Sequence, residues 1–140
     1  MWKYEKKLQY PVNIKRTDPA AAKVIITQFG GPDGELGASL RYLSQRYTAP
    51  DARVKAILND IGTEELGHME MICTIVYQLT RNLTPAEIKE SGFDTYFVDH
   101  TTGLYPIAAS GTPFSAEIFQ STGDAIADLS EDMAADGTTL

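Results

Sequence analysis

One segment of thirty residues, 51–80, limits the folds open to this 140-residue chain. It contains no proline, and its two glycines are separated rather than paired, so nothing in it breaks a helix. Seven positions at alternating spacings of three and four fall on one helical face, which is the pattern of a buried seam. The segment therefore predicts one long helix packed against neighbours, and an all-α fold. The seam positions are Leu58, Ile61, Glu65, His68, Ile72, Ile75 and Leu79.

Two shorter helices are predicted before the long one. Asp18, followed by proline, is typical of a helix start, and a glycine pair ends this first helix, over residues 20–29. Asp33 is positioned to cap a second helix, over residues 34–47. Because the turn between the second helix and the long one is short, we expect the two to form an antiparallel hairpin.

The two ends of the chain lack a sustained helical pattern. Residues 8–14 alternate around a proline, which indicates an extended arm or an edge strand. A capping box at 84–87 opens a short helix, and residues 92–123 are then rich in glycine, proline and aromatics. This long irregular segment either wraps a neighbouring subunit or lies on the surface with its aromatics turned inward. Helical periodicity returns at 125–135, and we treat 1–140 as one domain.

Charge and hydropathy exclude two classes of partner. Twelve Lys and Arg against nineteen Asp and Glu give a net charge of −7, the wrong sign for binding nucleic acid. No apolar run approaches the roughly 18 residues that a membrane span needs, and no signal core is present, so we expect a cytoplasmic protein. Cys73 is interpreted as a small buried hydrophobe, and His100 as a hydrogen-bonding loop residue.

Glu65 and His68 interrupt the aliphatic seam with two polar side chains three residues apart. Buried without partners, they would cost on the order of several kcal/mol. A Glu-x-x-His pair on one helical face, joined by a Glu from the next helix, is how helical bundles bind a pair of metal ions. Glu35, near the start of the second helix, is the candidate for that further carboxylate. On spacing alone, a simple intrahelical Glu–His contact stays open as the alternative.

Tyr42 lies two turns beyond Glu35 on the same helical face. Its hydroxyl group is placed to hydrogen-bond a ligand carboxylate from outside the metal's own ligand set. A core tyrosine with its hydroxyl at the rim is the equally good alternative.

Several stretches of the chain resemble the manganese catalases, among them a spore-coat member of that family. The likeness extends over nearly the whole chain. It implies a ferritin-like four-helix bundle that binds two manganese ions, with Glu35, Glu65 and His68 as ligands and catalytic residues, and Glu65 as the bridge. The implied activity is disproportionation of hydrogen peroxide. The matching stretches are residues 4–11, 35–42, 60–70, 97–100 and 123–129.

The C-terminal end departs from the family pattern. There the family's third helix supplies a glutamate ligand after two alanines, and a fourth helix supplies a second Glu-x-x-His. Here Asp136 follows the two alanines, as a weak substitute ligand, and the sequence ends at Leu140. We therefore expect a homo-oligomer, at least a dimer, in which two half-bundle hairpins complete one site at a twofold axis. We also expect the hairpin's aliphatic seam to be uncovered until that partner binds.

Two other interpretations stay open. Carboxylate and imidazole ligands suit iron as well as manganese, and an iron form would be a ferritin-like oxidase. Alternatively, the chain is a truncated relative with only a structural role in the spore coat, where other coat proteins are its partners. Metal analysis separates the enzyme from the scaffold.

Overall fold

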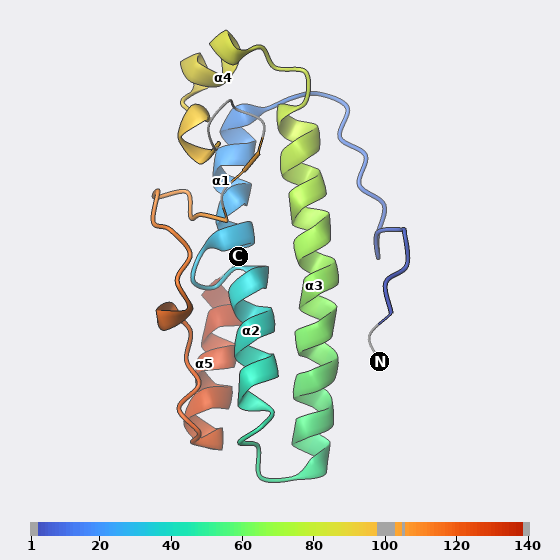
Figure 1. Cartoon of the computed structure of the whole chain (residues 1–140), viewed down its shortest axis with the longest axis vertical. Coiled ribbons are helices and arrows are strands. Elements are labelled where there is room, and N and C mark those ends of the chain that lie inside the picture. The colour runs from blue at the N-terminus through green and yellow to red at the C-terminus, as the bar shows by residue number, and fades with distance from the viewer. Residues whose placement is uncertain (1–2, 98–102, 105, 139–140) are drawn as a thin grey trace.

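The structure, a computed structural model, describes residues 3–97, 103–104 and 106–138. These residues form an elongated helical bundle, with two isolated β-bridges and no strand among them (Figure 1). The longest helix, α3 (Ala52–Thr80), confirms the predicted long helix, and the Asp51 side chain caps it by accepting two backbone N–H groups. Within the described part of the chain, no helix is long and apolar enough to cross a bilayer.

Two helices follow one another along the same side of α3: α1 (Pro19–Gly30) and α2 (Glu35–Gln45) (Figure 1). The α2–α3 pair is the predicted antiparallel hairpin. Gly62 allows the two helices to approach closely, because a Cβ atom there would lie 2.9 Å from the Leu43 side chain. At the same point the Ser39 hydroxyl donates a 2.6 Å hydrogen bond to the Gly62 carbonyl. This close approach fixes the register between α2 and α3.

The start of α2 differs from the prediction. Its N-cap is Gly34, which has no side chain to cap the helix, so the predicted Asp33 cap is wrong. Asp33 instead lies 3.4 Å from the Nη2 atom of Arg41, whose side chain is only 1% exposed. A buried guanidinium needs a carboxylate more than a helix end needs a cap, because the unpaired charge is the costlier of the two.

The aliphatic seam of α3 is largely covered within the chain, which corrects the expectation that it is exposed. Leu58 packs against α2 and Leu79 against α1, while Ile61 is the one exposed aliphatic residue of the seam, at 37%. The prediction failed because it considered only contacts within the hairpin and did not expect α1 to pack on α3. The buried cluster between α1 and α3 consists of Ala22, Ile26, Val76, Leu79, Ile88, Phe93 and Tyr96.

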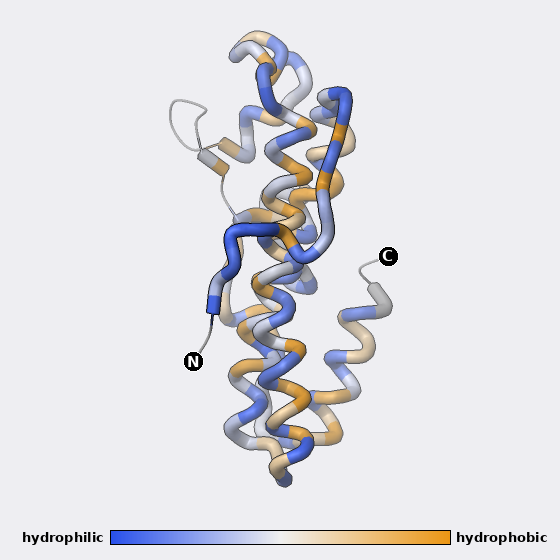
Figure 2. Tube along the Cα trace, turned by 90° about the vertical axis from the view of Figure 1, so that its right-hand side faces the viewer, coloured by the Kyte–Doolittle hydropathy of each residue, from blue (hydrophilic) through white to orange (hydrophobic). Residues whose placement is uncertain are grey.

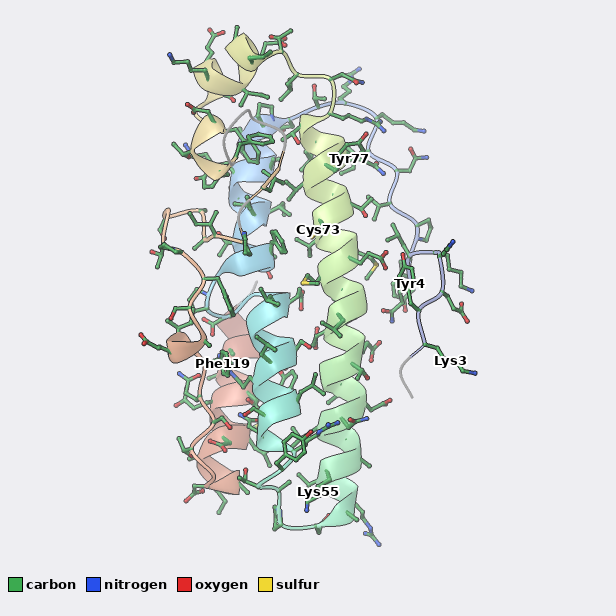
Figure 3. The ribbon with its side chains drawn as sticks, in the orientation of Figure 1. Lys3, Tyr4, Lys55, Cys73, Tyr77 and Phe119 are labelled. Atoms are coloured by element: carbon green, nitrogen blue, oxygen red, sulfur yellow. The ribbon has the colours of Figure 1, made fainter. Side chains whose placement is uncertain are left out.

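The N-terminal arm is extended and lies along α3, as the prediction of an arm required, and Tyr4 stands beside the helix (Figure 3). Side chains of α3 replace the partner strand that the arm lacks. Gln78 accepts from the Ile14 N–H at 2.7 Å and donates to the Val12 carbonyl at 3.0 Å. Nearer the middle of α3, the Gln9 amide donates to Glu64 at 2.7 Å.

The irregular segment follows α4 (Pro85–Ser91), which has the predicted capping box. Its described residues include the 3-10 turns η1 (Asp94–Tyr96) and η3 (Ala116–Ile118). Phe93 and Tyr96 are buried in the chain's own core, so they are not available to wrap a neighbouring subunit. His100 and Tyr105 lie outside the described residues.

The last helix, α5 (Ala125–Thr138), runs three residues beyond the predicted end and lies beside α2. Gln45 donates to Asp132 at 3.0 Å, so polar contacts hold the two helices together. An open groove of about 410 Å³ separates α5 from α3, and Figure 2 shows α5 standing apart from the main column of helices. The apolar residues of this groove are Val54, Ile57, Leu58, Ile61, Leu129 and Met133.

Candidate metal centre

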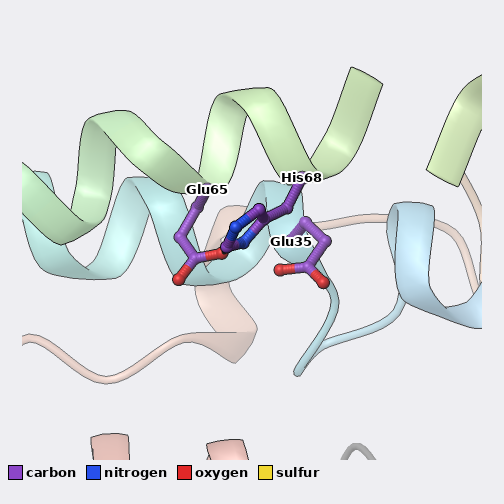
Figure 4. Close-up of side chains that lie close together, drawn as sticks. All are labelled: Glu35, Glu65 and His68. Atoms are coloured by element: carbon purple, nitrogen blue, oxygen red, sulfur yellow. The ribbon is translucent and has the colours of Figure 1, made fainter. Parts of the chain in front are cut away.

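Glu35, Glu65 and His68 converge in the described structure. Glu35 is the first residue of α2, and the other two lie one turn apart in the middle of α3 (Figure 4). One ligand atom from each side chain can be chosen so that all three lie within 4.8 Å of one another. The three residues that the sequence singled out are therefore brought together by the hairpin, as expected.

His68 presents its two ring nitrogens to different carboxylates. Its Nδ1 atom lies 2.6 Å from Oε2 of Glu65. Its Nε2 atom lies 3.8 Å from Oε1 of Glu64, whose side chain is 49% exposed. The Glu65 side chain is 12% exposed and that of His68 32% exposed, so the centre is half-buried and has an open side.

Glu35 has the most strongly perturbed carboxyl group of the three residues. Burial, followed by the hydrogen bond to Glu65 and the negative charge of Glu65, together raise its pKa from 4.5 to about 7. Two carboxylates held this close in a half-buried site cannot both ionise without a compensating charge. With a pKa of about 7, the Glu35 carboxyl is partly protonated at neutral pH, and a divalent cation bound there would displace that proton.

Tyr42 is buried, and its hydroxyl donates a 3.0 Å hydrogen bond to Oδ1 of Asp136 on α5. Its partner is thus Asp136 and none of the three converging residues. Burial and the contact with Asp136 raise the pKa of the tyrosine above its ordinary value of 10. Asp136 in turn adds to the negative charge that raises the pKa of Glu35, so Tyr42 and Asp136 border the centre without joining the cluster.

The donor set fits manganese or iron. Hard carboxylate oxygens with one imidazole nitrogen are ligands that both metals accept, and a bound cation would relieve the repulsion between Glu35 and Glu65. Two carboxylates and one ring nitrogen provide at most about five donor atoms. Two octahedral ions would need more donor atoms than these three residues offer.

Sequence reasoning missed Glu64 and Gln9. Glu64 precedes His68 by four residues, the spacing of helical neighbours, and this was the available signal. Nothing in the local pattern places Gln9 near them, because the arm reaches α3 through contacts that span more than fifty residues of sequence.

A ferritin-like helical fold with a Glu and a Glu-x-x-His on facing helices defines the class of dimetal-carboxylate proteins. The family model described as "Manganese containing catalase" matches residues 1–139. The chain belongs to the manganese catalase family.

Individual relatives agree with this assignment. Protein CotJC of Bacillus subtilis is 54% identical over 136 residues, covering 97% of this chain and 71% of that protein. A probable manganese catalase of Clostridium acetobutylicum is 36% identical and covers 97% of this chain and 61% of its own length. The crystal structure of KatB, a manganese catalase from Anabaena, superposes with a TM-score of 0.87 at 30% identity, covering 99% of this chain and 62% of KatB.

The chain thus spans about three fifths to seven tenths of the length of these relatives. The matched part contains both helices that carry the converging residues.

Proposed function

We propose that this chain provides half of a dimanganese centre that disproportionates hydrogen peroxide to water and oxygen. Glu35, Glu65 and His68 would hold the metal, with Glu65 as the carboxylate that both ions would share. The family membership supports manganese and this reaction. The observation that carries the proposal is the convergence of Glu35, Glu65 and His68, whose ligand atoms can be chosen to lie within 4.8 Å of one another.

The second set of ligands comes, in this proposal, from a second copy of the chain. Among the described residues there is one cluster able to hold a metal, and it offers too few donor atoms for two ions. The exposed apolar groove between α3 and α5 gives the second copy a surface to bury, and Tyr42 and Asp136, which border the metal centre, also line it. Two copies would together supply two Glu and two Glu-x-x-His sets.

Two manganese ions, when bound, exchange two electrons with peroxide, so no organic cofactor or external reductant is required. The side chains of this chain would hold the ions, and they must first give up the protons that compete with the metal for the same ligand atoms. Glu35 must release its proton before its oxygen can bind a cation, and Glu65 must break its hydrogen bond to the His68 ring. The 32% exposure of His68 leaves one side of the centre open for a molecule as small as peroxide.

Two alternatives have specific support. The same donor set accepts iron, and an iron-loaded centre would act as a ferritin-like oxidase. The 54% identity to CotJC favours, as the non-enzymatic alternative, a structural role in the spore coat beside other coat proteins.

Metal analysis of the purified chain tests the proposal, because about one manganese per chain is expected when two copies share two ions. Peroxide consumption and oxygen release should then follow manganese content. Protein that takes up no metal, or that takes up iron and consumes oxygen instead of producing it, would contradict the manganese catalase proposal. Cross-linking at the groove would distinguish a second copy from another protein as the source of the remaining ligands.

A further inference from the structure

The N-terminal arm is connected to the candidate metal centre through one exposed glutamate. Glu64 lies one helical turn before His68, and its Oε1 atom is 3.8 Å from the Nε2 atom of the ring. The same oxygen accepts a 2.7 Å hydrogen bond from the side-chain amide of Gln9 in the arm. The arm, the carboxylate and the imidazole therefore form a continuous series that ends at a ligand candidate.

The two nitrogens of His68 have different surroundings. Nδ1 lies 2.6 Å from Oε2 of Glu65, which is itself a ligand candidate. Nε2 lies 3.8 Å from Oε1 of Glu64, which is outside the cluster. A histidine that binds a metal through one nitrogen almost always donates its other N–H to a carboxylate, a carbonyl or water, and this fixes the orientation of the ring.

We propose that Glu64 is a positioning residue that orients the His68 ring for metal binding, and that Gln9 of the N-terminal arm holds Glu64 in place. This inference rests on the proposed function, since it assumes that Nδ1 binds the metal. In this arrangement Glu64 accepts the Nε2–H and fixes the orientation of the ring. The arm thereby becomes part of the centre's support rather than a separate appendage.

The fit between the arm and the helix supports this role. A Cβ atom on Gly67 would lie 3.3 Å from Oε1 of Gln9, so the absence of a side chain there lets the Gln9 amide lie close to α3. Glu64 would otherwise be a mobile surface side chain, because it is 49% exposed. The 3.8 Å separation is longer than a direct hydrogen bond, and it shortens by rotation of the Glu64 carboxylate when metal binding fixes the ring.

The chain contains a matched control. Glu70 also lies on α3 and holds the arm, because it accepts a 2.9 Å hydrogen bond from the Tyr4 hydroxyl. Within the described part of the chain, the carboxylates that lie beside the His68 ring are Glu64 and Glu65, and Glu70 is not among them. Glu64→Leu and Glu70→Leu therefore each remove one carboxylate that tethers the arm, and only the first removes the neighbour of the imidazole.

The test measures Mn²⁺ affinity by competition with a chelator in the full chain. Glu64→Leu should weaken binding by about 10–100-fold, the usual effect of losing such a supporting group. Glu64→Gln, which retains an acceptor, should recover part of the loss. The Mn²⁺ affinity of Gln9→Ala should lie between those of Glu64→Leu and Glu70→Leu. The affinity of Glu70→Leu should equal that of the parent protein.

A second readout separates positioning from a general loss of structure. The chain contains two histidines, so ¹⁵N-histidine labelling gives two sets of ring signals, and His100→Gln assigns them. In protein loaded with diamagnetic Zn²⁺, the Nε2–H of His68 should exchange slowly with water. It should exchange rapidly in Glu64→Leu and slowly in Glu70→Leu.

The outcomes distinguish this inference from the proposed function. If Glu65→Gln abolishes Mn²⁺ binding while Glu64→Leu leaves the affinity and the ring exchange unchanged, the role of Glu64 is overturned and the metal centre stands. Equal losses in Glu64→Leu and Glu70→Leu would also overturn it, because they would indicate only loosening of the arm. If the parent chain binds no Mn²⁺, the proposed function itself fails.

Discussion

The Nδ1 atom of His68 lies 2.6 Å from Oε2 of Glu65, one turn earlier on the same helix. Both side chains lie on the face of α3 that meets α2, where the remaining seam positions are aliphatic. A polar pair in such a position is costly unless it is satisfied. The two side chains satisfy each other, and the Glu35 carboxyl forms a further hydrogen bond with Glu65. A metal ion would replace these contacts with stronger ones.

Glu65→Gln should lose metal almost completely, because the neutral amide cannot bridge two cations. Metal content measured by mass spectrometry after dialysis should fall from about one ion per chain to near zero. Glu131→Gln, on the exposed face of α5, is the matched control and should retain the parent content. Full metal content in Glu65→Gln would place the binding site elsewhere.

Metal binding should release protons near neutral pH. Burial raises the pKa of Glu35 from 4.5 to about 7, so the chain enters binding with this carboxyl partly protonated and must release the proton. Mn²⁺ affinity should therefore rise with pH up to about 7 and level off above it. Calorimetry in buffers of different ionisation enthalpy measures the number of protons released on metal binding. A value of zero at pH 6 would contradict the claim that Glu35 releases a proton when the metal binds.

The stability of the metal-free chain should fall as pH rises from 4.5 to 7. In this window the native state retains a proton on Glu35 that the unfolded state has released, so the free energy of unfolding decreases with pH. The full shift corresponds to about 3 kcal/mol, which solvent screening at this half-exposed site reduces to about 1–2 kcal/mol. Urea denaturation at several pH values measures it. Glu35→Gln should flatten the dependence, and an unchanged slope in that variant would assign the effect to another group.

Tyr42→Phe should loosen α5 without removing metal. The lost hydrogen bond to Asp136 is worth about 1 kcal/mol, and it is one of the few contacts between α5 and the hairpin. Hydrogen exchange of α5 amides should accelerate by about fivefold, the equivalent of that energy. Tyr77→Phe, at a 63% exposed position on α3, should leave α5 exchange unchanged. Metal loss in Tyr42→Phe would instead indicate that Tyr42 acts directly on the ligands.

Self-association should depend on the groove between α3 and α5. Leu129→Asp puts a charge into the groove next to Asp132 and should convert the metal-loaded oligomer to monomer in sedimentation velocity experiments. Ile126→Asp is the control, because Ile126 lies on the same helix, is 81% exposed and does not line the groove. An oligomer that survives Leu129→Asp but dissociates with Ile126→Asp would move the interface to the outer face of α5.

Much of the fold could be predicted because its determinants are local. The α3 seam, the Asp18 cap and the Thr84 capping box depend on spacings of three or four residues and were predicted from those spacings. The convergence of Glu35 with Glu65 and His68 followed from one short turn. These features need no knowledge of distant contacts.

The features that the sequence did not reveal depend on tertiary contacts. Asp33 forgoes the helix cap because Arg41, eight residues later, is buried beside it. The α3 seam is covered by α1 because the chain continues α1 and α2 along the same side of the long helix (Figure 1). Gln9 meets Glu64 across 55 positions of sequence. Each of these contacts depends on how whole helices are placed, which no local pattern records.

The central claim is that Glu35, Glu65 and His68 bind manganese in a centre shared by two copies. Anomalous X-ray diffraction from crystals grown with Mn²⁺, collected at the manganese edge, tests it most directly. The account predicts two anomalous peaks about 3.5–4 Å apart, bridged by Glu65 and bound by these three residues from two chains. Peaks that lie away from all three side chains, or their absence in a fully folded chain soaked with Mn²⁺, would contradict it.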